Sequence, residues 1–455
     1  MAGRKATTNI IPGDSALSVN NPGTTPPEDW LWVSLNEVAR MATGHTPSRN
    51  HPEYWGGNVS WIAVGDCRFK SGTTILETKE CTNQIGIENS AAVLLPKGTV
   101  CLSRTGSIGY VVIMGKEMAT SQGFVNWVCS EILLPRFLQL LFMAERSFLY
   151  KISEGTAHTT IYFPEVKAFN ICLPPLPTQR AIVAKIEALF SDLDKGIADL
   201  KKAQDQLKVY RQAVLKKAFE GELTKEWREQ SRFTKNDWRF PPLGEVLIQS
   251  KEKHKPENVE NLFYVGLEHI GKETGSLTET VSVSEIKTIK NKFKTGQILY
   301  GKLRPYLNKV YLAKESGVCS TDILVFNLED SIVGKFAVQF MLSRQFVNDM
   351  SANTNGVNLP RVSTKYVNNY KFPLPSCEEQ HQIVQEIESR LSVCDKVEES
   401  INESLEKAKA LRQSILKKAF EGTLLSEEEI AACKAAPDYE PASVLLEKIK
   451  AEKKK

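Results

Sequence analysis

The stretch RQAVLKKAFEGELT at residues 211–224 returns almost unchanged as RQSILKKAFEGTLL at residues 412–425. Arg211 and Arg412, which open the two copies, lie 201 positions apart. A chain of 455 residues is too long for one hydrophobic core and long enough for two or three domains. The repeat therefore predicts two related halves.

Each copy of the repeat ends a long segment whose apolar residues lie mostly three or four positions apart, which indicates an amphipathic helix. At about 40 residues, or roughly 60 Å, each segment is long enough for a coiled-coil seam. The apolar positions are Ile182, Ile186, Leu189, Leu193, Ile197, Leu200, Leu207, Tyr210 and Val214 in the first copy, and Ile383, Ile387, Leu391, Ile401, Leu405, Leu411 and Ile415 in the second.

Both segments carry signals for the ends of a helix. The proline-rich stretches LPPLP at 173–177 and FPLP at 372–375 disfavour helix just before each segment. Ser376 and Glu379 have the S-x-x-E spacing of a capping box. Gly221 and Gly422 follow the shared KKAFE and predict left-handed caps at the C-terminal ends.

Shorter similarities extend the repeat upstream of the helices. PEDWLWVSLNEV at 27–38 resembles KNDWRFPPLGEV at 235–246, which aligns Trp30 with Trp238. We expect both tryptophans to be core anchors. Between such anchors the halves diverge, and short β-branched runs such as GTVCLS and DILVFNL accompany apolar helical stretches in each half.

The expected fold class is α/β or α+β, with two globular domains related by an approximate two-fold and joined by two long antiparallel coiled-coil helices. The first 28 residues are polar and are predicted to be a disordered tail. The expected boundaries are a tail at 1–28, a globular domain at 29–176, a helical spacer at 177–224, a second domain at 225–375, a second spacer at 376–425 and a C-terminal tail at 426–455.

Composition excludes several classes of protein. The longest apolar run, FLQLLFMA at 137–144, falls short of the roughly 20 residues that cross a bilayer. The N-terminus lacks a secretory apolar core, so we expect a cytoplasmic protein without membrane contact. The nine cysteines contain no C-x-x-C pair, which argues against a disulfide framework and a metal site. A net charge of +4 neither demands nor excludes nucleic acid.

Motifs for autonomous catalysis are missing from the sequence. There is no G-x-G-x-x-G and no Walker A stretch. A DNA-adenine methyltransferase would need [DNS]-P-P-[YFW], to which FPPL at 240–243 is the nearest match. We therefore expect no catalytic residue and no cofactor bound by this chain.

A duplicated unit in which LPPLPTQRAIVAKI at 173–186 leads to RQAVLKKAFEGELT resembles the specificity subunits of Type I restriction-modification systems. In that family the globular parts are target recognition domains, each reading one half of a split, asymmetric double-stranded DNA site. The helices set the distance between the halves and dock two methyltransferase subunits, which methylate adenine at N6. The resemblance implies that these partners bind S-adenosylmethionine, and that restriction subunits join through them and use ATP and Mg²⁺.

Two loop sequences resemble different recognition-domain subtypes, so we expect two dissimilar half-sites. They are LSRTGSIGYVVI at 102–113, which belongs with SQGF at 121–124, and YGKLRPYLNKVYLA at 300–313. An arginine can contact guanine or hold a phosphate, an amide can contact adenine, and a stretch of basic and aromatic residues is of the kind that follows a nucleic-acid backbone. Each of these residues could instead have a structural role without DNA contact. Those alternatives are a tight turn with a solvated arginine in the first half, a buried structural amide at position 122, and a solvated strand face in the second half. The candidate DNA-binding residues are Arg104, Thr105, Ser107, Gln122, Lys302, Arg304, Tyr306 and Lys309.

One partner docked twice needs the same surface twice, which accounts for the repeat. Alternatively, the lysines of the repeated stretch (Lys216, Lys217, Lys417 and Lys418) are simply solvated at the ends of the helices. A different reading of the whole chain is a two-ended protein scaffold that never binds DNA. The candidate partner-binding residues are Arg211, Lys216, Lys217, Phe219, Arg412, Lys417, Lys418 and Phe420.

Overall fold

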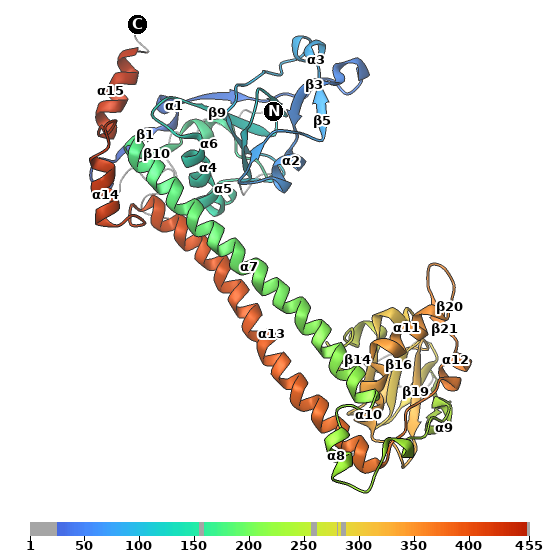
Figure 1. The fold of residues 1–455 in the computed structure, drawn as a ribbon. Coiled ribbons are helices and arrows are strands. Elements are labelled where there is room, and N and C mark those ends of the chain that lie inside the picture. The colour runs from blue at the N-terminus through green and yellow to red at the C-terminus, as the bar shows by residue number, and fades with distance from the viewer. Residues whose placement is uncertain (1–24, 154–158, 256–261, 280, 284–287, 453–455) are drawn as a thin grey trace. The chain divides into compact units, whose positions relative to one another are not determined.

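The computed structural model describes residues 25–153, 159–255, 262–279, 281–283 and 288–452. The chain divides into two compact units: residues 1–198 with 405–455 form unit 1, and residues 199–404 form unit 2. Each unit contains one globular domain and part of both long helices (Figure 1). Residues 1–24, most of the expected N-terminal tail, lie outside the described residues.

Short strands and helices make up the globular domain of unit 1. They are β1 (Leu31–Ser34), α1 (Leu35–Val38), β2 (Ala39–Thr43), β3 (Trp55–Ile62), α2 (Val64–Phe69), β4 (Thr74–Ile75), β5 (Glu80–Thr82), α3 (Gln84–Glu88), β6 (Val100–Ser103), β7 (Val111–Met114), β8 (Ala119–Thr120), β9 (Phe124–Cys129), α4 (Pro135–Ala144), α5 (Arg146–Lys151), α6 (Phe163–Lys167) and β10 (Asn170–Leu173).

The main sheet of unit 1 has the order β2-β9-β6-β7-β4 and is covered on both faces. Successive side chains of a strand point to opposite faces. Val100 and Leu102 of β6 join the core beneath α4 and α5, whereas Cys101 between them faces a second sheet of order β5-β3-β8. The domain is therefore three layers, helices over sheet over sheet.

Unit 2 repeats this plan. Its globular elements are α8 (Lys225–Glu229), α9 (Leu243–Val246), β11 (Leu247–Gln249), β12 (Lys253–His254), β13 (Leu262–Val265), β14 (Val281–Val283), β15 (Lys290–Phe293), β16 (Ile298–Gly301), β17 (Val310–Leu312), β18 (Gly317–Cys319), β19 (Ile323–Leu328), α10 (Gly334–Met341), α11 (Arg344–Ala352), β20 (Thr354–Asn355), β21 (Arg361–Val362) and α12 (Thr364–Asn369).

The order β11-β19-β16-β17 in unit 2 matches β2-β9-β6-β7 in unit 1. Ile298 and Tyr300 of β16 face the helical layer, whereas Leu299 faces the second sheet, of order β12-β15-β18-β13-β14. The predicted mixture of helices and sheets, repeated in the two halves, is confirmed.

The two long helices are α7 (Leu176–Phe219) and α13 (Cys377–Phe420), with 44 residues each. Gly221 and Gly422 have φ of 76° and 72°, a conformation that is strained for any residue with a Cβ. The next residues, Glu222 and Thr423, donate their backbone N–H groups five positions back, as in a Schellman motif. The predicted left-handed caps are confirmed. Among the described residues, no helix is both long and apolar enough to span a bilayer.

The predicted capping box at the start of α13 is only half correct. The Ser376 hydroxyl accepts from the backbone N–H of Glu379 at 3.2 Å. The carboxylate of Glu379, only 1% exposed, pairs with Arg228 and accepts from the indole N–H of Trp238 at 2.9 Å. A buried carboxylate needs a charged partner, which the helix cap does not offer. Trp238 is thereby confirmed as a core anchor.

Within each unit the two long helices run antiparallel. In unit 2, Gln204 of α7 bonds to Asn402, and Arg211 further along α7 bonds to Asp395, which comes earlier in α13. In unit 1, the cluster of Ile182, Ile186 and Phe190 from α7 packs with Ile415, Leu416 and Phe420 from α13. The predicted apolar stripe is confirmed at Ile182, Ile186 and Ile415, and Phe190, Leu416 and Phe420 join it.

Two positions assigned to the stripe are exposed instead. They are Tyr210 and Leu411, which occupy equivalent places in the repeat. The reason is the next residue in each copy: Arg211 and Arg412 send their guanidinium groups to carboxylates of the facing helix. A neighbour on the helix then points away, because adjacent residues do not share a face.

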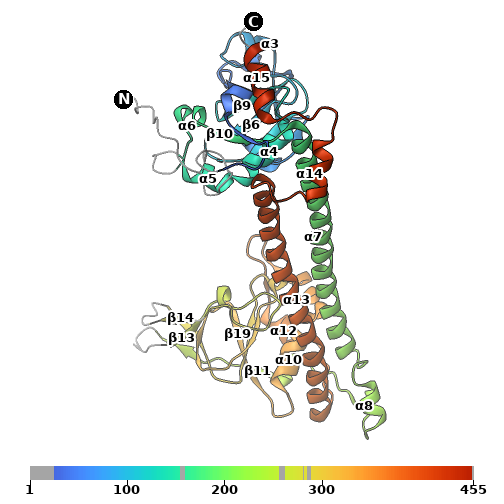
Figure 2. The ribbon, with the colours of Figure 1, turned by 90° about the vertical axis from the view of Figure 1, so that its left-hand side faces the viewer.

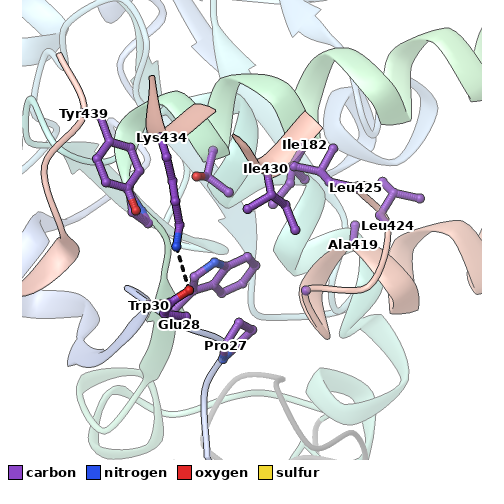
Figure 3. Close-up of a pocket in the computed structure, with 13 residues that line it drawn as sticks. Pro27, Glu28, Trp30, Ile182, Ala419, Leu424, Leu425, Ile430, Lys434 and Tyr439 are labelled. Carbon is purple, nitrogen blue, oxygen red and sulfur yellow. Dashed lines mark hydrogen bonds and ion pairs between the residues drawn. The ribbon is translucent and has the colours of Figure 1, made fainter. Parts of the chain in front are cut away.

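The segment after α13 folds onto unit 1 as α14 (Glu427–Lys434) and α15 (Ala442–Glu452). Figure 2 shows α14 beside α7, where Lys185 pairs with Glu429 at 2.7 Å. Figure 3 shows a pocket beneath this segment, lined by Trp30 and apolar side chains, with Lys434 bonded to Glu28 at 2.6 Å. Its volume of about 120 Å³ is below the roughly 300–1,000 Å³ of small-molecule sites. Trp30 is thus half-buried against the core rather than enclosed in it.

Candidate nucleic-acid interface

Loops of unit 1 gather at one edge of its main sheet. β2 ends at Thr43, opposite Val125, and β6 ends at Ser103, opposite Phe124. The loops attached to these ends therefore lie side by side; we call residues 44–50, 104–110 and 121–123 the unit 1 edge. It holds the predicted residues Arg104, Thr105, Ser107 and Gln122.

Arg104 is held by backbone and side chain alike. Its N–H donates to Gly123 at 2.8 Å, and its carbonyl accepts from Ile161 at 2.9 Å. The guanidinium lies 4.3 Å from the ring centre of Phe163 and donates to the Ile161 carbonyl at 3.3 Å. Burial lowers the pKa of this guanidinium. The side chain is half-buried and its Nε has no partner, so this arginine is only partly solvated.

The turn after Arg104 is tight. Gly106 has a φ of 72°, and the backbone N–H of Ser107 donates to the Thr105 carbonyl at 2.8 Å. The Ser107 carbonyl also accepts from the hydroxyl of Ser103 at the end of β6. The tight turn considered as a structural alternative is therefore present. It leaves Thr105 and Ser107 half-exposed beside Arg104.

Gln122 is exposed at this edge, so the alternative of a buried structural amide is wrong. The turn from β8 to β9 directs its side chain outward, where its Oε1 accepts from the hydroxyl of Thr46. This bond joins the loop at 121–123 to the loop at 44–50. An amide in that position can present a donor and an acceptor to a base edge.

Two indoles hold the loop at 44–50, a role that sequence reasoning missed. The indole N–H of Trp61 donates to the His45 carbonyl at 3.0 Å, and that of Trp55 donates to the Ser48 carbonyl at 3.2 Å. Trp61 is buried, but Trp55 is half-buried against the loop.

The Arg49 side chain also holds the loop at 44–50 in place. The Arg49 guanidinium lies 3.9 Å from the Trp55 ring centre and forms two bonds to the Glu80 carboxylate, at 3.0 and 2.7 Å. A bidentate pair fixes both distance and orientation. Only the pairing of β3 with β5 brings Glu80 here, so no local spacing could have revealed the contact.

The matching edge of unit 2 carries the second set of predicted residues. β16 ends at Gly301, opposite Ile323 at the start of β19. We call the loops at 302–309 and 320–322 the unit 2 edge. Lys302 and Lys309 are half-exposed, and Arg304 and Tyr306 are exposed.

The loop at 302–309 is not the solvated strand face considered as its structural alternative. Pro305 starts a short 3₁₀ helix, Pro305–Leu307, which interrupts the strand pattern. The Lys309 ammonium is used within the unit, because it donates to the Leu267 carbonyl. Lys302, Arg304 and Tyr306 remain as the outward-facing group.

Backbone strain marks the unit 2 edge. Arg304 and Asn308 flank the 3₁₀ helix with φ of 51° and 44°, in the left-handed region. Each non-glycine residue there costs on the order of 1–3 kcal/mol, and such residues cluster at functional sites. Asn308 is fixed by a bond from its amide to the Leu342 carbonyl at 3.2 Å.

The negative charge of Asp322 at this edge is balanced by Arg361, which lies 39 positions further along the chain. Arg361 makes two bonds of 2.9 Å to the carboxylate of Asp322. These bonds to Arg361 lower the pKa of Asp322. Asp322, the acidic residue within this edge, is therefore paired with Arg361.

Arg211 and Arg412, two of the predicted partner-binding residues, are used inside the chain. Arg211 pairs with Asp395 at 2.7 Å and Glu398 at 3.0 Å, and Arg412 pairs with Asp194. The repeat therefore has a cause within the molecule, because the same interhelical pair is made in both units.

The repeated phenylalanines likewise pack on their own units. Phe219 meets Phe336 at 5.4 Å between ring centres, and Phe420 meets Phe137 at 5.2 Å. Phe420 is only 2% exposed. The lysines of the repeat are exposed: Lys216, Lys217, Lys417 and Lys418.

Residues 27–202 and 235–407 match the family described as the Type I restriction modification DNA specificity domain. The chain belongs to this family. It is a specificity subunit of a Type I restriction-modification system, as the sequence resemblance predicted.

Relatives match two thirds or more of the chain. The specificity subunit of the Type I restriction enzyme EcoDI from Escherichia coli is 28% identical over 453 residues, which span 94% of this chain and 96% of that protein. The EcoBI specificity subunit, also from Escherichia coli, is 26% identical over 349 residues, spanning 67% of this chain and 70% of that one.

Solved structures share the fold. A chain from a study of complex assembly and conformational transition of the type I R-M system gives a TM-score of 0.67 at 21% identity, covering 88% of this chain and all of that one (100%). The HsdS subunit from Thermoanaerobacter tengcongensis gives 0.55 at 21% identity, covering 88% of this chain and 98% of that one.

Proposed function

We propose that the unit 1 edge and the unit 2 edge each read one half of a bipartite, asymmetric DNA site. The observation that carries this proposal is that loops at the same place in the same sheet order bear cationic side chains in both units, with an exposed amide, Gln122, in unit 1. The loop sequences differ, so the two half-sites differ as well. Electrostatic attraction to phosphates supplies affinity, and contacts to base edges supply sequence preference.

Individual roles follow from exposure and geometry. Arg104 is oriented by Phe163 and suits a bidentate contact to guanine or a phosphate. Gln122 suits adenine. Thr105 and Ser107 permit close approach of the backbone to DNA. On the unit 2 edge, Lys302 and Arg304 hold phosphates and Tyr306 offers a stacking face, whereas Lys309 positions the loop through Leu267.

The long helices set the distance between the half-sites and dock two methyltransferase subunits. Tyr210 and Leu411 support this proposal, because they are exposed apolar residues at equivalent positions of the repeat, one in each unit. The exposed lysines of the repeat follow them on each helix, six and seven positions further along the chain. Restriction subunits attach through the methyltransferases.

The chemistry belongs to the partners. Adenine N6 methylation with S-adenosylmethionine takes place on the methyltransferase subunits, and ATP and Mg²⁺ serve the restriction subunits. This chain binds none of these cofactors in the proposal and contributes DNA recognition alone.

Mobility shifts of this chain with its methyltransferase test the proposal. We expect a salt-sensitive complex that prefers one bipartite sequence, identified beforehand by sequencing methylated adenines in a host that carries both proteins. A protein scaffold without DNA binding predicts no shift at any salt concentration. Arg104→Ala should weaken discrimination in one half-site only, and Arg304→Ala should weaken binding through the other; equal loss at both halves would contradict the assignment.

A further inference from the structure

A hairpin of unit 2 stands beside the unit 2 edge and took no part in the sequence-based prediction. Its strands β20 and β21 pair Thr354 with Val362 and Asn355 with Arg361. Figure 1 shows the hairpin extending away from the sheet of unit 2. Gly356, with a φ of 92°, opens the turn at 356–360.

The hairpin and the basic loop form one structure. The backbone N–H of Arg304 donates to the Pro360 carbonyl at 2.7 Å, and that of Val362 donates to the Lys302 carbonyl at 3.1 Å. The Arg361 side chain closes the arrangement on Asp322. The left-handed conformation of Arg304 is thus held by the hairpin, and the hairpin has a fixed place relative to the cations.

The tip of the hairpin is apolar and fully in solvent. Val357 is 98% exposed and Leu359 is 49% exposed. Asn355 and Asn358, on either side of Val357, are also exposed. Single exposed apolar residues are common, but two of them at the tip of a protruding hairpin form a surface available to another molecule.

Charge and shape favour DNA as that molecule. Residues 353–361 contain no acidic side chain, and the hairpin is bonded directly to the loop that carries Lys302 and Arg304. A two-stranded ribbon fits the major groove of B-form DNA. There an asparagine amide pairs with adenine N6 and N7, and an aliphatic side chain packs on the C5-methyl group of thymine.

We propose that the hairpin at 354–362 enters the major groove and reads A·T base pairs of the half-site assigned to unit 2, with Val357 on a thymine methyl group and Asn358 on an adenine. This inference rests on the proposed function and adds to it a second reading element, distinct from the loop at 302–309. Lys302 and Arg304 hold the phosphates, and the hairpin supplies sequence preference.

Replacement of thymine by uracil tests the proposal directly, because uracil lacks the C5-methyl group. The complex of this chain with its methyltransferase is titrated with duplexes in which single thymines of the recognised site become uracil. At one position of a single half-site we expect several-fold weaker binding by the wild type. Val357→Ser should bind the thymine and uracil duplexes equally, and Asn358→Ala should lose about tenfold discrimination at a base pair of the same half.

The outcomes separate this inference from the function on which it rests. If the wild type binds its site without preferring thymine anywhere in that half, or if Val357→Ser keeps the preference, the hairpin proposal is overturned and the proposed function stands. If the wild type prefers no sequence at all, the proposed function itself fails.

A protein partner is the competing occupant of the hairpin tip. Loss of methyltransferase binding by Val357→Ser, measured by size-exclusion chromatography, would assign the tip to that contact and overturn the proposal. Ile289→Ser, another exposed aliphatic residue of unit 2, serves as the matched control and should change neither readout.

Discussion

Nη2 of Arg211 lies 2.7 Å from Oδ1 of Asp395 in unit 2, and Arg412 makes the same contact with Asp194 in unit 1. Both arginines and both aspartates are 201 positions apart in sequence. Each arginine of one repeat copy therefore binds the aspartate of the other copy. The repeated sequence thus first serves the chain itself, by making the same antiparallel contact in each unit.

The two residues of the unit 1 ion pair, Arg412 and Asp194, should contribute unequally to the free energy of unfolding. Both residues are partly exposed, so Asp194→Ala should cost only about 0.5 kcal/mol. Arg412 also lies 4.4 Å from the ring centre of Phe190, so Arg412→Ala should cost about 1–2 kcal/mol. Urea unfolding gives both values, and the double variant should show a coupling below about 1 kcal/mol. Equal costs for the two single variants would contradict the stacking contribution.

Two buried glutamines should each stabilise their own unit. Gln179 accepts from Leu134 N–H at 2.9 Å and donates to Ile132, and Gln380 accepts from Val333 N–H at 2.8 Å and donates to Ser331. Replacement by leucine leaves buried backbone groups unpaired, so each variant should lose about 2–3 kcal/mol.

Hydrogen exchange followed by mass spectrometry should locate these losses. Gln179→Leu should speed exchange in unit 1 and Gln380→Leu in unit 2, because their bonds lie within those units. Gln413→Leu, at an exposed position, is the control and should change nothing. Exchange that rises equally in both units would show that they unfold together.

Phe420→Ala should destabilise unit 1 by about 3–5 kcal/mol, because it leaves a cavity beside Phe137. Lys417→Ala removes an exposed charge one helical turn away, together with a long ion pair to Glu421 at 3.8 Å, and should change the free energy of unfolding by less than about 0.5 kcal/mol. Chemical denaturation compares the two. If Phe420→Ala kept full stability but lost the methyltransferase, Phe420 would be a docking residue rather than a core residue.

Charge placed at the two exposed repeat positions should remove the methyltransferases one at a time. Tyr210→Asp and Leu411→Asp should each reduce the stoichiometry from two methyltransferases to one, and the double variant should bind none. Sedimentation or native mass spectrometry measures this. Val393→Asp is the matched control: Val393 is 60% exposed, and its counterpart in the first copy is already Asp192. Unchanged stoichiometry in the double variant would place docking elsewhere.

Much of the architecture could be predicted from sequence because it depends on local patterns. Apolar residues three or four apart specify a helix, and glycines such as Gly221 and Gly422 end it because they adopt a positive φ without strain. The repeat at Arg211 and Arg412 identified two related halves and, through them, the family.

Long-range contacts decided what local patterns could not. Spacing assigned Tyr210 to the helical seam, but Arg211 reaches Asp395, 184 positions along the chain, and turns the tyrosine outward. The same applies to the loop at 44–50, where Arg49 meets Glu80 only because β3 pairs with β5.

The sequence by itself determined where the helices lie and how they end, since both follow from residues within a few turns of one another. The repeat also showed by itself that the halves share one plan. Tertiary structure alone decided which side chains the protein uses for its own packing and which remain free for other molecules. Phe420 and Val357 are both apolar, yet one is enclosed against Phe137 and the other stands in solvent. Burial is set by what the rest of the chain brings to a residue, and no short stretch of sequence contains that information.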